Sequence, residues 1–266
     1  MYIDIAEKAY WVEEHGRGHP IVLLHGFTGS SKSWDYYVGI WKDNYKVITI
    51  DLPGHGKTKI NQVVHMEEFC DDLHTILSRL QLKQIILIGY SLGGRSALSF
   101  TMMYPNQVTS LILESASPGL KSSQEQIARQ MKDDGLANKI ETEGIVAFID
   151  YWEQIPLFQT QNKLSDSTKA IVRQERLSQS ESGLALSLRG MGTGVQPSWW
   201  EQLPELSLPV LLVVGESDIK FIDIAKQMND RIKTSELEII PNAGHNVHLE
   251  QAQKFIESVT EFLEKN

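Results

Sequence analysis

The sequence predicts an α/β fold, in which a mostly parallel central sheet carries helices on both faces. Short apolar segments alternate with longer segments of helical period along most of the chain. The apolar segments are nearly continuous, which is typical of strands buried on both faces of a sheet. The chain has 266 residues, 41% of them hydrophobic, so it can bury one substantial core.

The predicted strands are six short segments rich in leucine and β-branched residues. The first twenty residues include the segment AYWVEEHGRGHP and predict an antiparallel hairpin at one edge of the sheet. The six strands of the main sheet are predicted at residues 21–26, 46–54, 84–90, 108–116, 209–218 and 235–244.

Two segments between and after these strands have the apolar spacing of amphipathic helices, with apolar residues three and four positions apart. Such a spacing places one apolar stripe on the face that packs against a sheet. The first stripe consists of Met66, Phe69, Cys70, Leu73, Ile76, Leu77 and Leu80, and the second of Phe255, Ile256, Val259, Phe262 and Leu263.

The alternation of strands and helices is interrupted once, between the fourth and fifth strands. Residues 120–200 contain no convincing strand, but they include the helical stretches SQEQIARQMKDDG and SDSTKAIVRQERL. We therefore predict a core made of residues 1–119 and 201–266 and a helical cap insertion at 120–200. Such an insertion would lie at one end of the sheet and could roof a pocket.

Composition limits the classes of partner. The chain has 34 acidic and 25 basic side chains and a net charge of −9, so nucleic acid is not an expected partner. No apolar run is long enough for a membrane span, and no basic segment followed by an apolar one suggests a signal peptide. The lone cysteine, Cys70, excludes a disulfide and a thiolate metal cluster. We expect a soluble, cytoplasmic protein without metal or cofactor, and the oligomeric state stays open.

The segment GYSLG at 89–93 matches the G-x-S-x-G pattern of a nucleophile elbow. In this motif a strand turns sharply into a helix and holds the serine in a strained conformation. An apolar strand precedes the segment and the helix-like RSALSFTMMY follows it, as the motif requires. Ser91 is therefore the predicted catalytic serine.

A catalytic serine needs a histidine as base and an acid that orients it. After a nucleophile elbow, the acid comes first along the chain and the histidine second. His245 lies after the last predicted strand, where the base belongs, and Asp218 ends the strand before it. His248 is a competing base that we expect to pack or cap a helix. Glu114 is an alternative acid, although a structural role beneath the pocket is the preferred interpretation.

Other polar groups near these motifs have simpler interpretations. His25 and His55 are interpreted as structural histidines of turns. An oxyanion hole needs backbone N–H groups, and we expect them from Leu92, directly after the serine, and from Phe27 in the turn HGFTG.

Arg95 lies four residues after Ser91, on the helix that follows the elbow. This helix is normally buried, and an unpaired buried guanidinium is costly, so we expect Arg95 to have an anionic partner. That partner is either an internal carboxylate such as Glu114 or a carboxylate of the substrate, which a guanidinium binds well with its planar fork.

The motifs together are similar to those of a known group of enzymes. LLHGFTGSSKSW, IDLPGHGKT, GYSLGG, VVGESD and AGHNVHLE resemble the α/β-hydrolase superfamily and cover nearly the whole sheet part of the chain. GYSLGGR, SASPGL, VQP and AGHNVH resemble, more narrowly, the family of 2-succinyl-6-hydroxy-2,4-cyclohexadiene-1-carboxylate synthases of menaquinone biosynthesis. The resemblance implies an α/β-hydrolase fold and a cofactor-free lyase that eliminates pyruvate from a cyclohexene tricarboxylate, with the serine triad as the base.

By position, the resemblance also implies that Tyr90, Arg129, Trp152 and Arg176 contact the substrate. Arginines near the site fit a small-molecule polycarboxylate in a chain whose net charge is negative. Arg173 and Arg189 are expected to lie on a solvated helix face, and Ser117 stands where relatives carry histidine.

Two other functions remain open at this point. A serine carboxylesterase or carbon–carbon bond hydrolase would use the same triad through an acyl-enzyme, but it would not require several arginines. A small-molecule binding protein on the same scaffold would often lack a member of the triad, and this sequence has all three.

Overall fold

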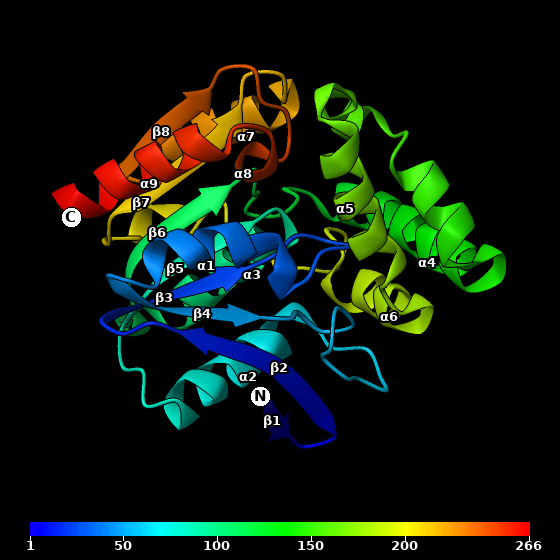
Figure 1. Ribbon diagram of the computed structural model, residues 1–266, viewed down its shortest axis with the longest axis horizontal. Helices are drawn as coiled ribbons and strands as arrows, with labels where there is room; N and C mark the ends of the chain where they lie inside the picture. Colours follow the sequence, from blue (N-terminus) through cyan, green and yellow to red (C-terminus); the bar gives the residue numbers. More distant parts are fainter.

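The computed structural model describes residues 1–266 and contains one eight-stranded sheet in the order β1-β2-β4-β3-β5-β6-β7-β8 (Figure 1). Strands β3 to β8 are parallel, whereas β1 and β2 pair antiparallel at one edge, so the predicted fold class and edge hairpin are confirmed. The strands are β1 (Tyr2–Ile5), β2 (Lys8–His15), β3 (His19–Leu24), β4 (Tyr45–Ile50), β5 (Ile85–Tyr90), β6 (Val108–Glu114), β7 (Val210–Gly215) and β8 (Ser235–Ile240).

Strand β5 lies at the centre of the sheet, between β3 and β6. Gly89 of β5 is in register with Leu24 of β3 and Leu113 of β6, and Tyr90 is in register with Glu114. All six residues of β5 are buried, which accounts for its unbroken apolar sequence. The carboxyl end of β5 therefore lies in the middle of the row of strand ends, where residues that follow the neighbouring strands can converge.

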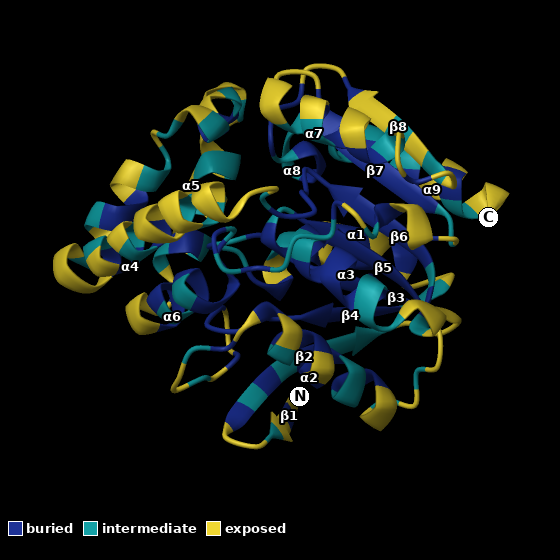
Figure 2. Ribbon diagram, turned by 180° about the vertical axis from the view of Figure 1, so that it is seen from behind, coloured by how far each residue is buried: buried dark blue, intermediate teal, exposed yellow.

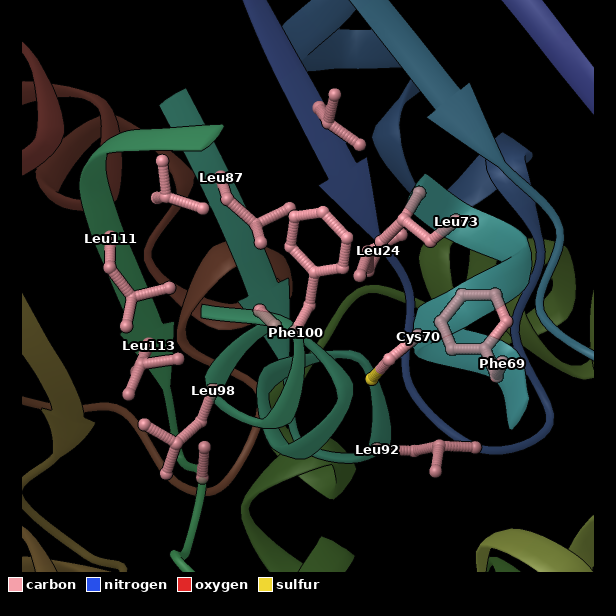
Figure 3. Close-up of a cluster of buried hydrophobic side chains, with 14 of the residues drawn as sticks. Leu24, Phe69, Cys70, Leu73, Leu87, Leu92, Leu98, Phe100, Leu111 and Leu113 are labelled. Carbon is pink, nitrogen blue, oxygen red and sulfur yellow. The ribbon is translucent and has the colours of Figure 1, made fainter. Parts of the chain in front are cut away.

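Helices cover both faces of the sheet, each with its own apolar cluster. On one face, α2 (Met66–Arg79), α3 (Leu92–Met103) and α7 (Ile219–Asn229) pack on the strands, and Figure 3 shows leucines of β5 and β6 against Phe100 of α3. The other face carries α1 (Asp35–Trp41) and α9 (Ala252–Lys265). Figure 2 shows the buried strands enclosed by helices whose outer sides are exposed.

The segment between β6 and β7 forms a group of helices beyond the carboxyl ends of the strands (Figure 1). We call them the cap helices: α4 (Ser123–Trp152), η3 (Pro156–Lys163), α5 (Asp166–Leu177) and α6 (Glu181–Met191). Their small core joins α4 to α6 through residues such as Ile140, Phe148 and Leu184. No strand forms between residues 120 and 200, as the sequence predicts.

Several predicted strands are longer than the observed ones. The segments predicted at 46–54, 209–218 and 235–244 leave the sheet at Ile50, Gly215 and Ile240. Just past the first of these ends, the Asp51 carboxylate accepts backbone N–H bonds from Ser31 and Lys57 and so holds the loops beside the strand end. The remaining short elements are η1 (Ser31–Trp34), η2 (Pro105–Gln107), η4 (Leu203–Glu205) and α8 (Val247–Glu250). None of the helices has the length and apolar composition needed to cross a membrane.

Candidate active site

Ser91 occupies a sharp turn between β5 and α3. Its backbone has φ of 50° and ψ of −105°, a conformation that non-glycine residues rarely adopt and that stores strain. The turn requires glycine at position 93, because the end of β3 comes very close: a Cβ at Gly93 would lie 2.1 Å from the carbonyl oxygen of Leu24. The strained turn lifts the serine hydroxyl out of the strand end.

Ser91, His245 and Asp218 form a continuous hydrogen-bonded chain. The Nε2 atom of His245 lies 3.0 Å from the Ser91 Oγ, and its Nδ1 atom lies 2.6 Å from Oδ2 of Asp218. His245 and Asp218 are buried, while Ser91 is partly exposed. With Nδ1 donating to the carboxylate, Nε2 is free to accept the hydroxyl proton, so the arrangement can activate the serine oxygen.

Glu114 and His248 form a second histidine–carboxylate pair outside this chain. The Glu114 carboxylate accepts a bond from the backbone N–H of His248, and its other oxygen lies 2.7 Å from Nδ1 of that histidine. The His248 ring stacks on buried Trp34 with ring centroids 4.5 Å apart. The backbone carbonyl of Glu114 accepts the N–H of Ser91, at 2.9 Å, but no side-chain hydrogen bond joins the pair to the Ser91 chain, which agrees with the structural roles expected for both residues.

His25 and His55 are fully enclosed and lie edge to face, 5.2 Å apart. Nε2 of His25 accepts the backbone N–H of Leu52, and its Nδ1 donates to the carbonyl of Gly26. Burial lowers the pKa of His25 to about 4 and that of His55 to about 3. Both are therefore neutral at physiological pH, and they hold the turns on either side of the site.

Leu92 and Phe27, the two expected donors of the oxyanion hole, lie beside Ser91 in the lining of one cavity. Leu92 is the first residue of α3, so its backbone N–H has no acceptor within the helix. Phe27 belongs to a turn closed by the bond from Gly29 N–H to Gly26 C=O, 3.1 Å long. Both backbones are thus fixed near the serine.

The cavity at Ser91 has a volume of about 500 Å³ and is bounded by core residues and cap helices. Apolar and aromatic side chains make up much of its wall, and Ser117 lies in it as well. Most of the expected site residues share it: Phe27, Tyr90, Ser91, Leu92, Arg95, Arg129, Trp152 and His245. Asp218 lies behind His245, as its hydrogen bond requires.

Arg95 lines this cavity without a carboxylate partner. Its Nη1 donates to the backbone carbonyl of Met191, at 2.7 Å, and to the side-chain oxygen of Gln196. The expected alternative of an ion pair with Glu114 is wrong, because His248 already occupies that carboxylate. Burial is the main cause that lowers the pKa of Arg95 to about 9, and the charge of Arg129 adds to it. Arg95 remains a cation at neutral pH, held by neutral acceptors.

Three more cations line the same cavity: Lys121, Arg129 and Lys220. Arg129 forms an ion pair of 2.7 Å with buried Asp133, one turn further along α4. Lys220, which the sequence interpretation missed, lines the cavity from the first turn of α7, and burial and the nearby Arg129 lower its pKa. Its position, two residues after Asp218, is the signal that could have identified it. Arg95 and these three cations outnumber the carboxylates of the wall, Glu125 and Asp223, so this part of an acidic protein is locally cationic.

Arg176 lies outside the cavity of Ser91, in contrast to the expectation that it joins the same enclosure. It lines an adjoining cavity of about 480 Å³, which shares only Phe27, Tyr90 and Phe158 with the first. Its guanidinium donates to Gln161, at 3.0 Å, and to Glu153, at 3.4 Å, and it packs on the Phe158 ring. Gln161 and Glu153 line a third cavity, of about 260 Å³, together with Arg176.

Arg173 and Arg189 are further cap arginines, and both lie partly exposed on helix faces, as expected, where they also form salt bridges. Arg173 pairs with Asp150 and Glu153, and Arg189 pairs with Glu141. These bonds join α4 to α5 and α6, so they support the cap helices and leave neither guanidinium free for a ligand.

Comparison with known proteins places this geometry in a family. Residues 19–252 match the family described as alpha/beta hydrolase fold. A Bacillus subtilis (strain 168) protein, provisionally assigned as 2-succinyl-6-hydroxy-2,4-cyclohexadiene-1-carboxylate synthase, is 44% identical over 91% of this chain and 89% of its own length. The synthase of that name from Escherichia coli O17:K52:H18 (strain UMN026 / ExPEC) is 31% identical over 94% of this chain and 96% of its own.

The fold comparison points in the same direction. The structure of MenH from S. aureus superposes with a TM-score of 0.91 at 38% sequence identity, covering 96% of this chain and 98% of that one. The chain therefore belongs to the α/β-hydrolase fold family and, within it, to the family of 2-succinyl-6-hydroxy-2,4-cyclohexadiene-1-carboxylate synthases.

Proposed function

We propose that this protein is a lyase of menaquinone biosynthesis. It eliminates pyruvate from 2-succinyl-5-enolpyruvyl-6-hydroxy-3-cyclohexene-1-carboxylate and leaves 2-succinyl-6-hydroxy-2,4-cyclohexadiene-1-carboxylate. The observation that carries the proposal is the hydrogen-bonded chain of Ser91, His245 and Asp218 at the wall of a cavity lined by Arg95, Arg129 and Lys220. The relatives with the names given above support the same activity.

The two ring systems define the bonds that change. The proton leaves ring carbon 2, which is acidic because it lies next to the ketone of the succinyl group. Its electron pair forms the 2,3 double bond, the former 3,4 double bond moves to 4,5, and the C–O bond at carbon 5 breaks. The enolpyruvate that departs takes up a proton and becomes pyruvate. No oxidant or metal is needed to balance this elimination.

Each part of the site has a role in this scheme. Ser91, deprotonated by His245 while Asp218 holds the ring, takes the proton from carbon 2, and no acyl-enzyme is required. The N–H groups of Phe27 and Leu92 stabilise the negative charge that develops on the ketone oxygen.

The substrate carries three carboxylates, and the cations of the cavity bind them. Arg95 and Arg129 are the arginines that contact the substrate, Lys220 is a third cation, and Tyr90 and Trp152 shape the wall. Arg176 can join them only if one arm of the substrate passes Tyr90 and Phe158 into the adjoining cavity. The cap of residues 120–200 closes the site over the core of residues 1–119 and 201–266. A small polyanion of this kind is a metabolite of the cytoplasm, where we place the protein.

Pyruvate release from the tricarboxylate, coupled to lactate dehydrogenase and followed through NADH absorbance, tests the function. We expect turnover well above the spontaneous elimination. A rate no higher than the spontaneous one, together with rapid hydrolysis of p-nitrophenyl esters and a burst of nitrophenol, would instead assign the triad to a carboxylesterase, which forms an acyl-enzyme.

A further inference from the structure

Arg95 differs from the other arginines near the site in what it is bonded to. Each of the cap arginines has a carboxylate partner, whereas Arg95 donates only to a backbone carbonyl and to the amide oxygen of Gln196. The carboxylate pairs are Arg129–Asp133, Arg173–Asp150, Arg176–Glu153 and Arg189–Glu141.

Gln196 holds a fixed position behind Arg95. It is only 1% exposed and lies in the segment that returns from α6 to the core, where its backbone N–H donates to Gly192 at 3.2 Å. The bond between the two side chains joins residues 101 positions apart, one on α3 and one on this returning segment. Gln196 also belongs to the VQP motif, which has no role in the triad or the oxyanion hole.

The orientation of the Gln196 amide is determined by Arg95. A guanidinium has donors only, so the amide must turn its oxygen toward Arg95. Its nitrogen is then buried against Gly119, where a Cβ atom would lie 3.2 Å away, and it has no hydrogen-bond partner. Leaving a buried donor unpaired costs stability.

A glutamate at this position would avoid that cost. It has nearly the same shape as glutamine, lacks the unpaired donor, and would give Arg95 an ion pair like those of the cap arginines. Such a pair would also cancel the positive charge that faces the cavity. The amide is the less stable choice for the fold and the better one for binding an anion.

We propose that Gln196 is a positioning residue, which orients the guanidinium of Arg95 with a neutral acceptor and so keeps its charge free for a carboxylate of the substrate. This proposal deepens the proposed function and rests on it for the identity of the polycarboxylate. It assigns Gln196 no contact with the substrate, since Gln196 is absent from the cavity wall.

The decisive variant is Gln196→Glu, assayed for pyruvate release and thermal unfolding in the same preparation. We expect KM for the tricarboxylate to rise about tenfold or more, as when a charge-assisted hydrogen bond is lost. We expect kcat to change less, and the melting temperature to stay equal or rise. An unchanged KM would overturn the proposal, whatever the melting temperature does.

Two further variants serve as comparisons. One removes the acceptor that orients Arg95, and the other changes the net charge of the protein far from Arg95. Gln196→Met removes the acceptor without adding charge, so Arg95 keeps its charge but loses one of its two bonds; we expect a smaller rise in KM than with glutamate. Gln107→Glu is the matched control, because Gln107 also accepts one hydrogen bond, from His74, and lies at the amino end of β6, whereas the site lies at the carboxyl ends of the strands. An equal rise in KM for this control would attribute the effect to net charge and overturn the proposal.

A second assay keeps this test independent of the lyase activity. If the wild-type protein releases no pyruvate, the proposed function fails, but Gln196 can still be tested with p-nitrophenyl acetate and mono-p-nitrophenyl succinate. We expect the wild type to favour the anionic ester and Gln196→Glu to lose most of that preference in kcat/KM. Equal preference in the two proteins, or no preference in the wild type, would overturn the proposal.

Discussion

At the scale of single residues, two histidine–carboxylate pairs have similar chemistry but different surroundings. His245, bonded to Asp218, reaches the Ser91 hydroxyl, whereas His248 stacks on Trp34 and is bonded to Glu114 through its ring and its backbone N–H. Both histidines lie within the eight-residue segment AGHNVHLE, so contact with Ser91, and not the identity of the residue, decides which of them can act as the base.

The two histidines should respond differently to the same substitution. We expect His245→Gln and Ser91→Ala each to lower kcat by about a thousandfold or more, with no further loss in the double variant, because the triad acts as a unit. His248→Gln should keep kcat within about tenfold of the wild type but lower stability by about 1–3 kcal/mol, since it removes the ring that bonds buried Glu114 and stacks on Trp34, while the backbone N–H of residue 248 still binds that carboxylate. Pyruvate release and urea unfolding measure both effects. Inactive but stable His248→Gln would identify His248 as the base.

Lys220 provides a second test at this scale, because no motif singled it out. Lys220→Met should raise KM for the tricarboxylate about tenfold, the loss expected for one charge-assisted contact. Lys226→Met is the matched control on the same helix, where the side chain is exposed and lies outside the cavity. Steady-state kinetics of the two variants at equal ionic strength makes the comparison. Equal KM values would remove Lys220 from the binding site.

At the scale of elements, the cap helices place a small apolar core against the site. Phe148 is fully buried between α4 and α6, stacks on Trp152 with ring centroids 5.5 Å apart, and meets Phe27 edge to face. Trp152 and Phe27 both line the cavity at Ser91. The packing inside the cap therefore determines the shape of the cavity wall.

A substitution that creates a cavity in that small core should weaken substrate binding more than it destabilises the sheet. Truncating a buried phenylalanine costs about 3–5 kcal/mol, and the cap helices have few other buried side chains to share that loss. We expect Phe148→Ala to raise KM more than it lowers kcat and to speed proteolysis within residues 120–200, while Phe148→Leu stays close to the wild type. Limited proteolysis with mass spectrometry locates the cuts. Cuts confined to the core segments would contradict this role.

The elements show how far the sequence could predict this structure. Period and composition located the strands and the edge hairpin. The G-x-S-x-G motif and the chain order of acid and histidine pointed to the three residues that form the hydrogen-bonded chain, and their catalytic role stays a prediction. Strand ends were overestimated, because a pattern of apolar residues does not reveal that Asp51 captures the N–H groups of Ser31 and Lys57. The partner of Arg95 could not be predicted either, because Gln196 is 101 residues away and no spacing rule connects them.

At the scale of the whole molecule, charge is distributed unevenly. The chain carries a net charge of −9, yet four cations line a single cavity: Arg95, Lys121, Arg129 and Lys220. The net negative charge repels anions, whereas the cations of the cavity attract them. We expect this arrangement to favour small anions that fit inside the cavity over long polyanions, which would also contact the acidic exterior.

Stability of the whole molecule should also depend on pH through His25 and His55. Their pKa values in the folded protein are about 4 and about 3, well below the ordinary value of 6.5 that applies after unfolding. Between about pH 4 and pH 6.5 the unfolded chain binds more protons than the folded one, so the free energy of unfolding rises with pH in this range. The contribution of these histidines to stability is lost as the pH falls below 6.5. Each histidine contributes a slope of up to about 1.4 kcal/mol per pH unit.

His55→Gln isolates this effect, because the rest of the titrating groups stay the same. Burial raises the pKa of Glu175 and Glu250 in the folded protein, and these carboxyls act with the opposite sign, since the folded state then holds more protons. Their contribution cancels when the variant is compared with the wild type. Urea unfolding at pH 4.5, 5.5, 6.5 and 7.5 should show a slope smaller by about 1 kcal/mol per pH unit below pH 6.5 in the variant, and equal slopes above it. Parallel curves over the whole range would mean that the pKa of His55 is the same in the folded and unfolded states.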